Sequence, residues 1–411
     1  MKCFCEVHDG KFLRFAALYR EGLHAFRQYA ARGICVDGTF IKTFVGGILL
    51  VACFRNGNKE LQIIGVAVVS IEYEDNWTFF LQFISEHLDA PPSFIISDRD
   101  KGLTPAVKST FPTVHHYYCF RHLMENFNRV FKSKELKNMA WLLARAITGD
   151  DFDKQEKNLR ERNRKAADWL LHVGKEKWSL FHGPSPRYAM MTSNNVESIN
   201  NALRGIRKYP VLDMLMAIER YVGTKWYDKV SKPGLWNTVT NSGESLIART
   251  LQNDLNCRVS TFNDSAFLVT VHSRGQVPVE YSVSLNGPTA SCSCNYGQDA
   301  RAPCLHTVVC MRATNRMNDV YGFFDATWRS DSFHLAYSLG EGMHWPPPVL
   351  KDAVEIGECA APKIQKKRGR PKGKKRRESQ YATLQLTKKR KTHKCSVCGS
   401  SRHNKRHHQV K

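Results

Sequence analysis

The sequence predicts a mixed α/β protein to which small metal-binding modules are attached. Three apolar runs joined by turn residues between positions 34 and 71 indicate an antiparallel meander of strands. Residues 93–122 indicate a strand, a helix and a second strand in succession. Cysteines and histidines cluster after position 290, which is typical of zinc modules in an intracellular chain. We therefore expect a mixed sheet first and compact appended modules after it.

The first part of the chain is expected to begin with a helix. Residues 13–29 have apolar side chains at helical spacing, so we expect an N-terminal helical lead-in over residues 1–31. Helical spacing recurs at residues 74–88, which should pack across the meander. Asn56 and Gly57 form a strong hairpin-turn signal between two of the strands. The three expected strands are residues 34–40, 45–54 and 61–71.

An acidic residue ends the first strand of the strand-helix-strand unit. Residues 94–96 are a short apolar run, residues 101–110 have a helical pattern, and residues 114–118 form the second run. Asp98 therefore follows the carboxyl end of a strand, the edge where open α/β sheets bind ligands. The same position also suits an ordinary helix cap or turn residue.

The middle of the chain is expected to be helical. Residues 120–190 carry a charged helical pattern without an obvious strand, which predicts a helical insertion. Ser193 can cap the next helix, and Glu197 lies beside the apolar stripe of that helix. Farther on, alternation within residues 267–283 predicts a β-hairpin. A mixed globular stretch is expected to about residue 339, and residues 345–348 are expected to mark the end of folded structure.

Composition and charge restrict the class of protein. The chain has 411 residues, of which 42% are hydrophobic, so it can bury a sizeable core. Its apolar runs are too short to span a bilayer and its first residues lack a signal-peptide core, so we expect an intracellular protein without a membrane partner. Residues 360–411 hold 19 Lys and Arg against one acidic residue, Glu378. Such a polycationic segment is expected to meet nucleic acid.

Three carboxylates can converge on one crevice. Asp37 lies in a predicted strand or at its edge, Asp98 follows another strand, and Glu197 lies on a later helix. Mg²⁺ prefers carboxylate oxygens, and two ions about 3.5 to 4 Å apart stabilise the attacking and leaving oxygens of phosphoryl transfer. Surface acids or helix caps are the alternative interpretation of these three residues.

Five blocks of sequence resemble, in the same order, those of Mutator-like element transposases. The blocks are ICVDGTF, NWTFFLQFI, IISDRDKGL, YYCFRHL and KWSLFHGPSPRYAMMTSNNVESIN. The resemblance implies a ribonuclease H-like domain over residues 32–230 that is interrupted by a helical insertion at about 120–190. It further implies that Asp37, Asp98 and Glu197 form a DDE triad that binds Mg²⁺ or Mn²⁺.

The resemblance singles out three more residues. Cys119 and His122 match a C-x-x-H pair of that family, for which a zinc site and a structural role near the active site are both open. Trp178 lies where related enzymes carry an aromatic residue that can stack on a flipped DNA base. The alternative for Trp178 is a place in the protein core.

The strongest metal signal has the pattern C-x-C-x9-C-x-H and consists of Cys292, Cys294, Cys304 and His306. Three thiolates and one imidazole meet the tetrahedral preference of Zn²⁺, with buried reduced cysteines as the alternative. Cys310 stays unassigned. The pattern resembles a SWIM zinc finger, which we expect over residues 255–315 and before a connecting region at 316–359.

The basic tail is expected to begin as a disordered linker over residues 360–392. It contains a segment that resembles an AT-hook, because an extended Arg-Gly-Arg fits a narrow A·T minor groove. A nuclear localisation signal is the compatible alternative, supported by the basic run 388–391, so we expect the protein in the nucleus. The central residues of the AT-hook-like segment are Arg368, Gly369, Arg370 and Pro371.

Residues 393–411 have the spacing of a zinc knuckle. The last ligand is His where knuckles normally have Cys, and His407 could compete with His408 for that role. Knuckles bind single-stranded nucleic acid or partner proteins. The expected zinc ligands are Cys395, Cys398, His403 and His408.

The resemblance, together with the motifs, implies a Mutator-like DDE transposase. Its expected reaction is metal-dependent hydrolysis of DNA at an element end, followed by attack of the freed 3′-hydroxyl on target DNA. We expect element ends and target DNA as partners, and self-association into a dimer or a higher synaptic complex. The alternative is a domesticated or truncated transposase that regulates transcription by binding DNA without catalysis. Only a short segment precedes Asp37, so end recognition would reside in the C-terminal modules unless the copy is truncated.

Overall fold

The computed structural model describes residues 1–231, 238–252, 256–272, 277–286 and 290–338. The segments expected to form the AT-hook and the zinc knuckle lie outside the described residues. No helix in the described part of the chain is both long enough and apolar enough to cross a membrane.

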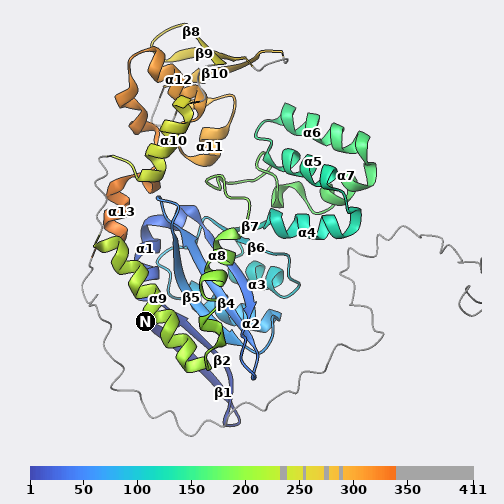
Figure 1. Ribbon diagram of the computed structural model, residues 1–411, viewed down its shortest axis with the longest axis vertical. Helices are drawn as coiled ribbons and strands as arrows, with labels where there is room; N and C mark the ends of the chain where they lie inside the picture. The colour runs from blue at the N-terminus through green and yellow to red at the C-terminus, as the bar shows by residue number, and fades with distance from the viewer. Residues whose placement is uncertain (232–237, 253–255, 273–276, 287–289, 339–411) are drawn as a thin grey trace, which may run out of the picture. The chain divides into compact units, whose positions relative to one another are not determined.

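A seven-stranded mixed sheet forms the centre of the fold (Figure 1). The strand order is β1-β2-β5-β4-β3-β6-β7; the pairs up to β3 are antiparallel, and the last two pairs are parallel. The mixed sheet confirms the predicted α/β class, and its middle strands form the predicted meander. The strands are β1 (Lys2–His8), β2 (Lys11–Leu18), β3 (Ile34–Phe40), β4 (Ile48–Arg55), β5 (Leu61–Val69), β6 (Phe94–Ser97) and β7 (His115–Tyr118).

The first 18 residues form strands, so the helix predicted from residue 13 is wrong in its first part. β1 and β2 are joined by Asp9 and Gly10, whose φ angles of 51° and 66° are those of a tight hairpin turn. β2 then pairs with β5 and extends the sheet by two strands. Helix α1 (Arg20–Tyr29) begins only after this pairing ends. Asp9-Gly10 is a hairpin-turn signal that the sequence analysis missed.

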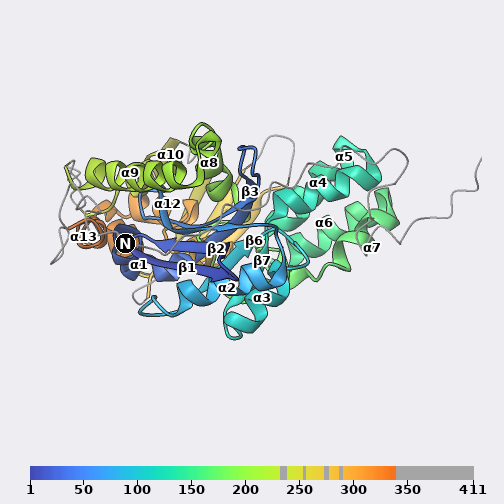
Figure 2. The same ribbon diagram turned by 90° about the horizontal axis from the view of Figure 1, so that it is seen from below.

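Helices cover both faces of the sheet (Figure 2). One face packs against α1, α2 (Glu74–Ser85) and α3 (Leu103–Thr110). The other face packs against α8 (Asn194–Ala202) and α9 (Val211–Val230). Nearly every residue of β4 and β5 is buried for this reason, which explains why these strands are continuous apolar runs in the sequence.

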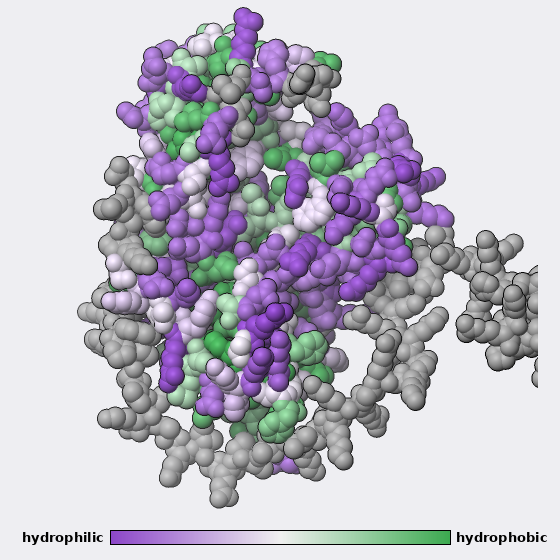
Figure 3. All heavy atoms as spheres, viewed as in Figure 1, coloured by the Kyte–Doolittle hydropathy of each residue, from purple (hydrophilic) through white to green (hydrophobic). Residues whose placement is uncertain are grey.

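Four helices between β7 and α8 form a unit with its own hydrophobic core, where the sequence predicts a helical insertion. Ser133, Thr148 and Asn163 cap three of them with side-chain oxygens that accept backbone N–H bonds. The face of this unit that is visible in Figure 3 is mostly hydrophilic. The helices are α4 (Phe120–Phe131), α5 (Lys134–Arg145), α6 (Gly149–Arg162) and α7 (Arg164–Leu171).

A second, antiparallel sheet has the order β11-β10-β9-β8. β9 and β10 are the two strands of the predicted hairpin, and β8 is an additional strand that pairs with β9. The helices and strands of this part of the chain are α10 (Asn241–Gln252), β8 (Cys257–Thr261), β9 (Ala266–Val271), β10 (Val279–Ser284), β11 (Ser291–Cys292), α11 (Tyr296–Ala300), α12 (Leu305–Ala313) and α13 (Ser330–Ala336).

Gly22 provides a test of the packing of α1 on β5. A Cβ added at Gly22 would overlap the carbonyl oxygen of Ile63 and lie 2.8 Å from the Cα of Ile64, so the helix would have to move away. We expect Gly22→Ala to lower the free energy of unfolding by about 1 to 3 kcal/mol in chemical denaturation. Gly205→Ala is the control, because a Cβ at that position meets no atom within 4 Å. Equal stabilities of the two variants would contradict this packing.

Candidate functional site

Asp37 and Asp98 come together because β3 and β6 are parallel neighbours. Ile34 pairs with Ile95 and Cys35 with Ile96, so the same register brings Asp98 level with Asp37. Neighbouring strands lie about 4.8 Å apart. The two carboxylates therefore emerge side by side at the carboxyl ends of adjacent strands, the edge at which the sequence predicts a site.

Alternation along the strands decides which face these carboxylates occupy. In β3, Ile34 and Val36 belong to the core beneath α1 and α2, whereas Cys35 belongs to the core beneath α8. Side chains two residues apart share a face, so Asp37 lies on the face of Cys35. Phe94 and Ile96 of β6 also belong to the core beneath α8, so the same alternation points Asp98 toward that face.

Helix α8 brings Glu197 to the same place. Asn200, one turn after Glu197, donates from Nδ2 to Oδ2 of Asp37 at 3.0 Å. The Glu197 carboxylate forms ion pairs with Arg121 and with His122, whose Nε2 lies 3.3 Å from Oε1. The structure thus gathers Asp37, Asp98 and Glu197 from β3, the end of β6 and α8, and we call these three residues the carboxylate cluster.

Burial and the negative charges of neighbouring carboxylates disfavour the charged forms of Asp37 and Asp98. Burial, then the charges of Asp98 and Glu197, raise the pKa of Asp37 to about 7. Burial also raises the pKa of Asp98. Carboxylate oxygens suit a hard divalent cation such as Mg²⁺ or Mn²⁺, and Asp37 and Asp98 offer them side by side. The ligand atoms of Asp37, Asp98 and Glu197 do not all lie within 4.8 Å of one another, because Glu197 is paired with Arg121 and His122.

Glu72 is a fourth carboxylate that the sequence analysis missed. A Cβ added at Gly38, the residue after Asp37, would overlap the Glu72 carboxylate, so Glu72 lies close to the cluster but on the opposite face of β3. Burial, then the charges of Asp98 and Asp100, raise the pKa of Glu72 to about 7. Glu72 follows a buried strand as Asp98 does, so the criterion that selected Asp98 could also have selected Glu72.

Cys119 and His122 contact each other and the carboxylate cluster. Burial opposes ionisation of the Cys119 thiol, but hydrogen bonds from His122 and Ser193 outweigh it and lower its pKa. The bond to Cys119 raises the pKa of His122 to about 9. Ser193 stands at the N-cap of α8, yet its backbone N–H bonds to Cys119 and its hydroxyl does not cap the helix as expected. These contacts fit the structural role that the sequence left open for the pair.

Trp178 lies inside the core of the helical insertion and is fully buried. Its ring packs against Phe120 and Phe152, with centroid distances of 5.8 and 6.1 Å. This placement fits the alternative of a core residue. Stacking on a DNA base would require the ring to be uncovered first.

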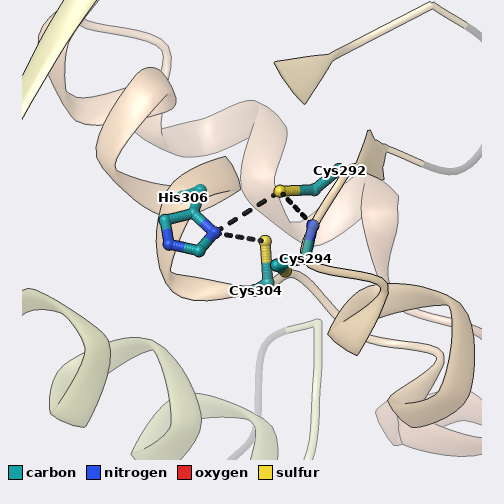
Figure 4. A group of neighbouring side chains, drawn as sticks. All are labelled: Cys292, Cys294, Cys304 and His306. Carbon is teal, nitrogen blue, oxygen red and sulfur yellow. Dashed lines mark hydrogen bonds between the residues drawn. The ribbon is translucent and has the colours of Figure 1, made fainter. Parts of the chain in front are cut away.

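Cys292, Cys294, Cys304 and His306 converge in the module after α10 (Figure 4). Their ligand atoms all lie within 4.8 Å of one another, and no other group of three or more potential ligands does so among the described residues. Nδ1 of His306 lies 3.4 Å from Sγ of Cys292 and 3.9 Å from Sγ of Cys304. The donor set and its convergence fit one tetrahedral Zn²⁺ ion.

Local structure prepares these ligands for a cation. Cys304 stands at the N-cap of α12, where its Sγ accepts the backbone N–H of Thr307 at 3.4 Å. Hydrogen bonds with Cys292 and Cys294, and then with His306 and Thr307, lower the pKa of the Cys304 thiol. The ring of Tyr281 stacks on His306 at a centroid distance of 3.9 Å and holds the imidazole in place.

Asp299, between the second and third cysteines, ties this module to the segment before α8. Its carboxylate accepts the N–H groups of Arg187 and Ala189, each at 2.9 Å, and its carbonyl oxygen accepts that of Tyr188 at 3.0 Å. Tyr188 and Ala189 have φ angles of 53° and 57°, which non-glycine residues rarely adopt. Asp299 therefore stabilises a strained turn close to the helix that carries Glu197.

Residues 33–126 match the family model of the MULE transposase domain. The matched segment contains Asp37, Asp98, Cys119 and His122 and ends before Glu197.

Three relatives extend this comparison. The transposase for insertion sequence element IS406 of Burkholderia multivorans is 26% identical over 208 residues, which cover 46% of this chain and 54% of that protein. The transposase for insertion sequence element IS256 in transposon Tn4001 of Staphylococcus aureus is 31% identical over 84 residues, 20% of this chain and 21% of that protein. Protein FAR-RED IMPAIRED RESPONSE 1 of Arabidopsis thaliana is 26% identical over 181 residues, 41% of this chain and 22% of that protein. The chain thus spans about half the length of the first relative and about a fifth of the other two.

The raised pKa of Asp37 predicts that the metal-free protein loses stability as pH rises. The pKa is 3.8 for an ordinary Asp and about 7 here, so the folded state binds the proton more tightly than the unfolded state. Stabilisation that is present below about pH 4 is then lost as pH rises through about 7, on the order of a few kcal/mol. Without added Mg²⁺ or Mn²⁺, the thermal midpoint of the wild type should fall more steeply across this range than that of Asp37→Asn.

Added Mg²⁺ should recover the stability of the wild type at pH 8 but not that of Asp37→Asn. Asp213→Asn, at an exposed position in α9, is the control and should behave as the wild type. Parallel pH profiles for the wild type and Asp37→Asn would contradict the crowding of the carboxylate cluster.

Removal of one cysteine ligand should release one equivalent of zinc. Cys304→Ser leaves three donors, so we expect its zinc content, measured with a metallochromic dye after denaturation, to fall by one ion per chain. Its thermal midpoint should fall as well, because bound metal stabilises only the folded module. Cys310→Ala, at a buried cysteine outside the group, should keep the zinc content of the wild type. Unchanged zinc in Cys304→Ser would refute the site.

Proposed function

We propose that the chain is a Mutator-like DDE transposase that cleaves DNA at element ends and joins it to target DNA. The observation that carries the proposal is the level placement of Asp37 and Asp98 on adjacent parallel strands, inside the segment that matches the MULE transposase domain. Glu197 reaches the same place from α8. The mixed sheet and the helical insertion between Asp98 and Glu197 support a ribonuclease H-like assignment of residues 32–230.

The residues around the carboxylate cluster have distinct parts in this proposal. Asp37 and Asp98 would hold Mg²⁺ or Mn²⁺ at the strand ends, and Glu197 would complete the second metal position. Bound ions would supply nucleophile activation and charge stabilisation in phosphoryl transfer. Asn200 orients the Asp37 carboxylate through its Nδ2 bond, whereas Arg121 and His122 hold that of Glu197.

The remaining modules would supply contacts with DNA. We assign the Cys292 to His306 group to a SWIM-type zinc finger, supported by the convergence of its four donors. The AT-hook-like segment and the zinc knuckle would bind DNA or partner proteins from the basic tail. Self-association into a dimer or a synaptic complex and a nuclear location complete the proposal.

A regulator that binds DNA without catalysis is the second candidate. The similarity to Protein FAR-RED IMPAIRED RESPONSE 1, which extends over 41% of the chain, favours it. A domesticated or truncated copy of this kind would keep the fold and the DNA contacts but would not need the metal-dependent reaction.

Cleavage and joining assays distinguish the two candidates. The substrate is a DNA that carries the inverted repeat found beside the gene, incubated with Mg²⁺ or Mn²⁺. We expect nicked and joined products from the wild type, and a decrease by a factor on the order of 10³ for Asp98→Asn, because a metal-holding charge is lost. Asp331→Asn, at an exposed position in α13, should retain activity. If both Asp98 forms bind DNA equally and neither cuts it, the regulator becomes the better account.

A further inference from the structure

We propose that a basic and aromatic rim beside Asp37 binds unpaired bases of the DNA strand next to the scissile phosphate. The rim comes from the end of β3, from the loop between β3 and β4 and from the segment that follows α8. The inference rests on the proposed function, since it concerns the DNA on which the carboxylate cluster would act. The rim consists of Phe40, Lys42, Phe44, Arg204, Lys208 and Tyr209.

Hydrogen bonds fix the rim close to the carboxylate cluster. The backbone N–H of Lys42 donates to the carbonyl oxygen of Arg207 at 2.8 Å. The Arg207 guanidinium donates to Thr39 and Phe40 on β3 and, at 3.0 Å, to the carbonyl oxygen of Asn200. Asn200 is the residue that binds Asp37. Figure 2 shows the loop between β3 and β4 projecting beside α8. Arg207 thus links the loop to Asn200, the residue whose side chain orients Asp37.

The cations of the rim are free to bind a polyanion. Lys42, Arg204 and Lys208 are exposed, and none of them forms an ion pair within the described part of the chain. Desolvation and the charges of Arg207, Arg204 and Lys208 lower the pKa of Lys42, so these positive charges lie close enough to repel one another. A phosphate backbone would relieve this repulsion and release its own counterions.

The aromatic rings of the rim suit bases rather than base pairs. Phe40 is 73% exposed, Phe44 is 75% exposed and Tyr209 is 50% exposed. Phe40 and Phe44 each lie two residues from Lys42, and Tyr209 directly follows Lys208. Proteins that bind single strands combine backbone-binding cations with rings on which bases stack, and stacking needs a base that has left the duplex. Duplex DNA would engage only the cations.

Two other occupants fit the rim less well. A second copy of the chain, related by twofold symmetry, would place the same unpaired cations opposite one another. An anionic membrane would match the cations and rings, but it would also face Asp37, Asp98 and Glu197 beside them. DNA meets those carboxylates too, yet in the proposed reaction divalent cations lie between them and the phosphates.

Photo-cross-linking locates the DNA on the full-length protein. The probe is a duplex with a single-stranded extension of iododeoxyuridine at one end, bound in the presence of Mg²⁺ and irradiated before cleavage products form. We expect cross-linked peptides that contain the loop between β3 and β4 or Tyr209. Cross-links confined to other parts of the chain, the basic tail included, would overturn the proposal.

Fluorescence anisotropy then measures the contribution of the rings. Phe44→Ala should bind the extended duplex about tenfold more weakly and a blunt duplex about as well as the wild type. Tyr227→Ala is the matched control, because that ring is 52% exposed but lies on α9, outside the rim. Equal losses for both DNAs, or no loss for either, would refute stacking on unpaired bases. Thermal midpoints equal to that of the wild type show that the variants fold.

Replacement of the three cations tests the backbone contact. We expect a smaller salt dependence of binding to the single-stranded extension in the triple variant Lys42→Ala, Arg204→Ala, Lys208→Ala. The slope of the logarithm of the binding constant against the logarithm of the salt concentration should decrease in magnitude by about 2. Binding of the wild type, but not of this variant, to vesicles with anionic lipid in preference to DNA would overturn the choice of partner. Loss of self-association in the variant with unchanged DNA binding would assign the rim to a second copy instead.

The outcomes separate this inference from the proposed function. If DNA binds at the rim but is never cut, the proposed binding of DNA at the rim stands and the proposed transposase activity is refuted. If cutting depends on Asp98 but no rim variant affects it, the proposed transposase activity stands and the proposed role of the rim is refuted.

Discussion

The parallel pairing of β3 with β6 is the constraint on which the arrangement of the carboxylates depends. A shift of one residue would turn Asp98 to the opposite face of the sheet, away from Asp37 and α8. The register is fixed by burial, because Ile34 and Ile95 belong to the core on one face, while Cys35 and Ile96 belong to the core on the other. The hydrophobic alternation that folds the sheet therefore also decides where the acidic groups emerge.

The position of α8 depends on contacts that are distant in sequence. Arg32, just before β3, is fully buried between the rings of Tyr188 and Trp328, at 4.6 and 4.4 Å from their centroids. Burial lowers its pKa to about 9, and its Nε donates to Thr327 at 2.9 Å. The rings and this bond offset part of the cost of a buried charge. Together with Asp299, Arg32 thus joins β3, the turn before α8 and the segment after α12.

The sequence sufficed where a local signal and the final fold agree. Turn residues and apolar runs predicted the meander, and an acid after a short buried strand predicted the place of Asp98. The strand Lys11–Leu18 was mistaken for helix because its apolar residues also fit a helical period, and pairing with β5 decided between the two. Asp299 could not be recognised at all, since its partners at 187–189 lie more than a hundred residues away.

The electrostatics of the carboxylate cluster bear on whether the protein is an enzyme. Asp37, Asp98 and Glu72 all have raised pKa values, so their ionisation opposes folding. A protein that only bound DNA would gain nothing from this arrangement, because crowded carboxylates repel phosphates as well as one another. Neutral side chains at the same positions would favour both stability and DNA binding. Arg121 and the protonated His122 offset the charge of Glu197, whereas a divalent cation at the strand ends, which DNA phosphoryl transfer requires, would offset the charges of Asp37 and Asp98. The unfavourable charge of the metal-free cluster is therefore itself an argument for metal-dependent chemistry.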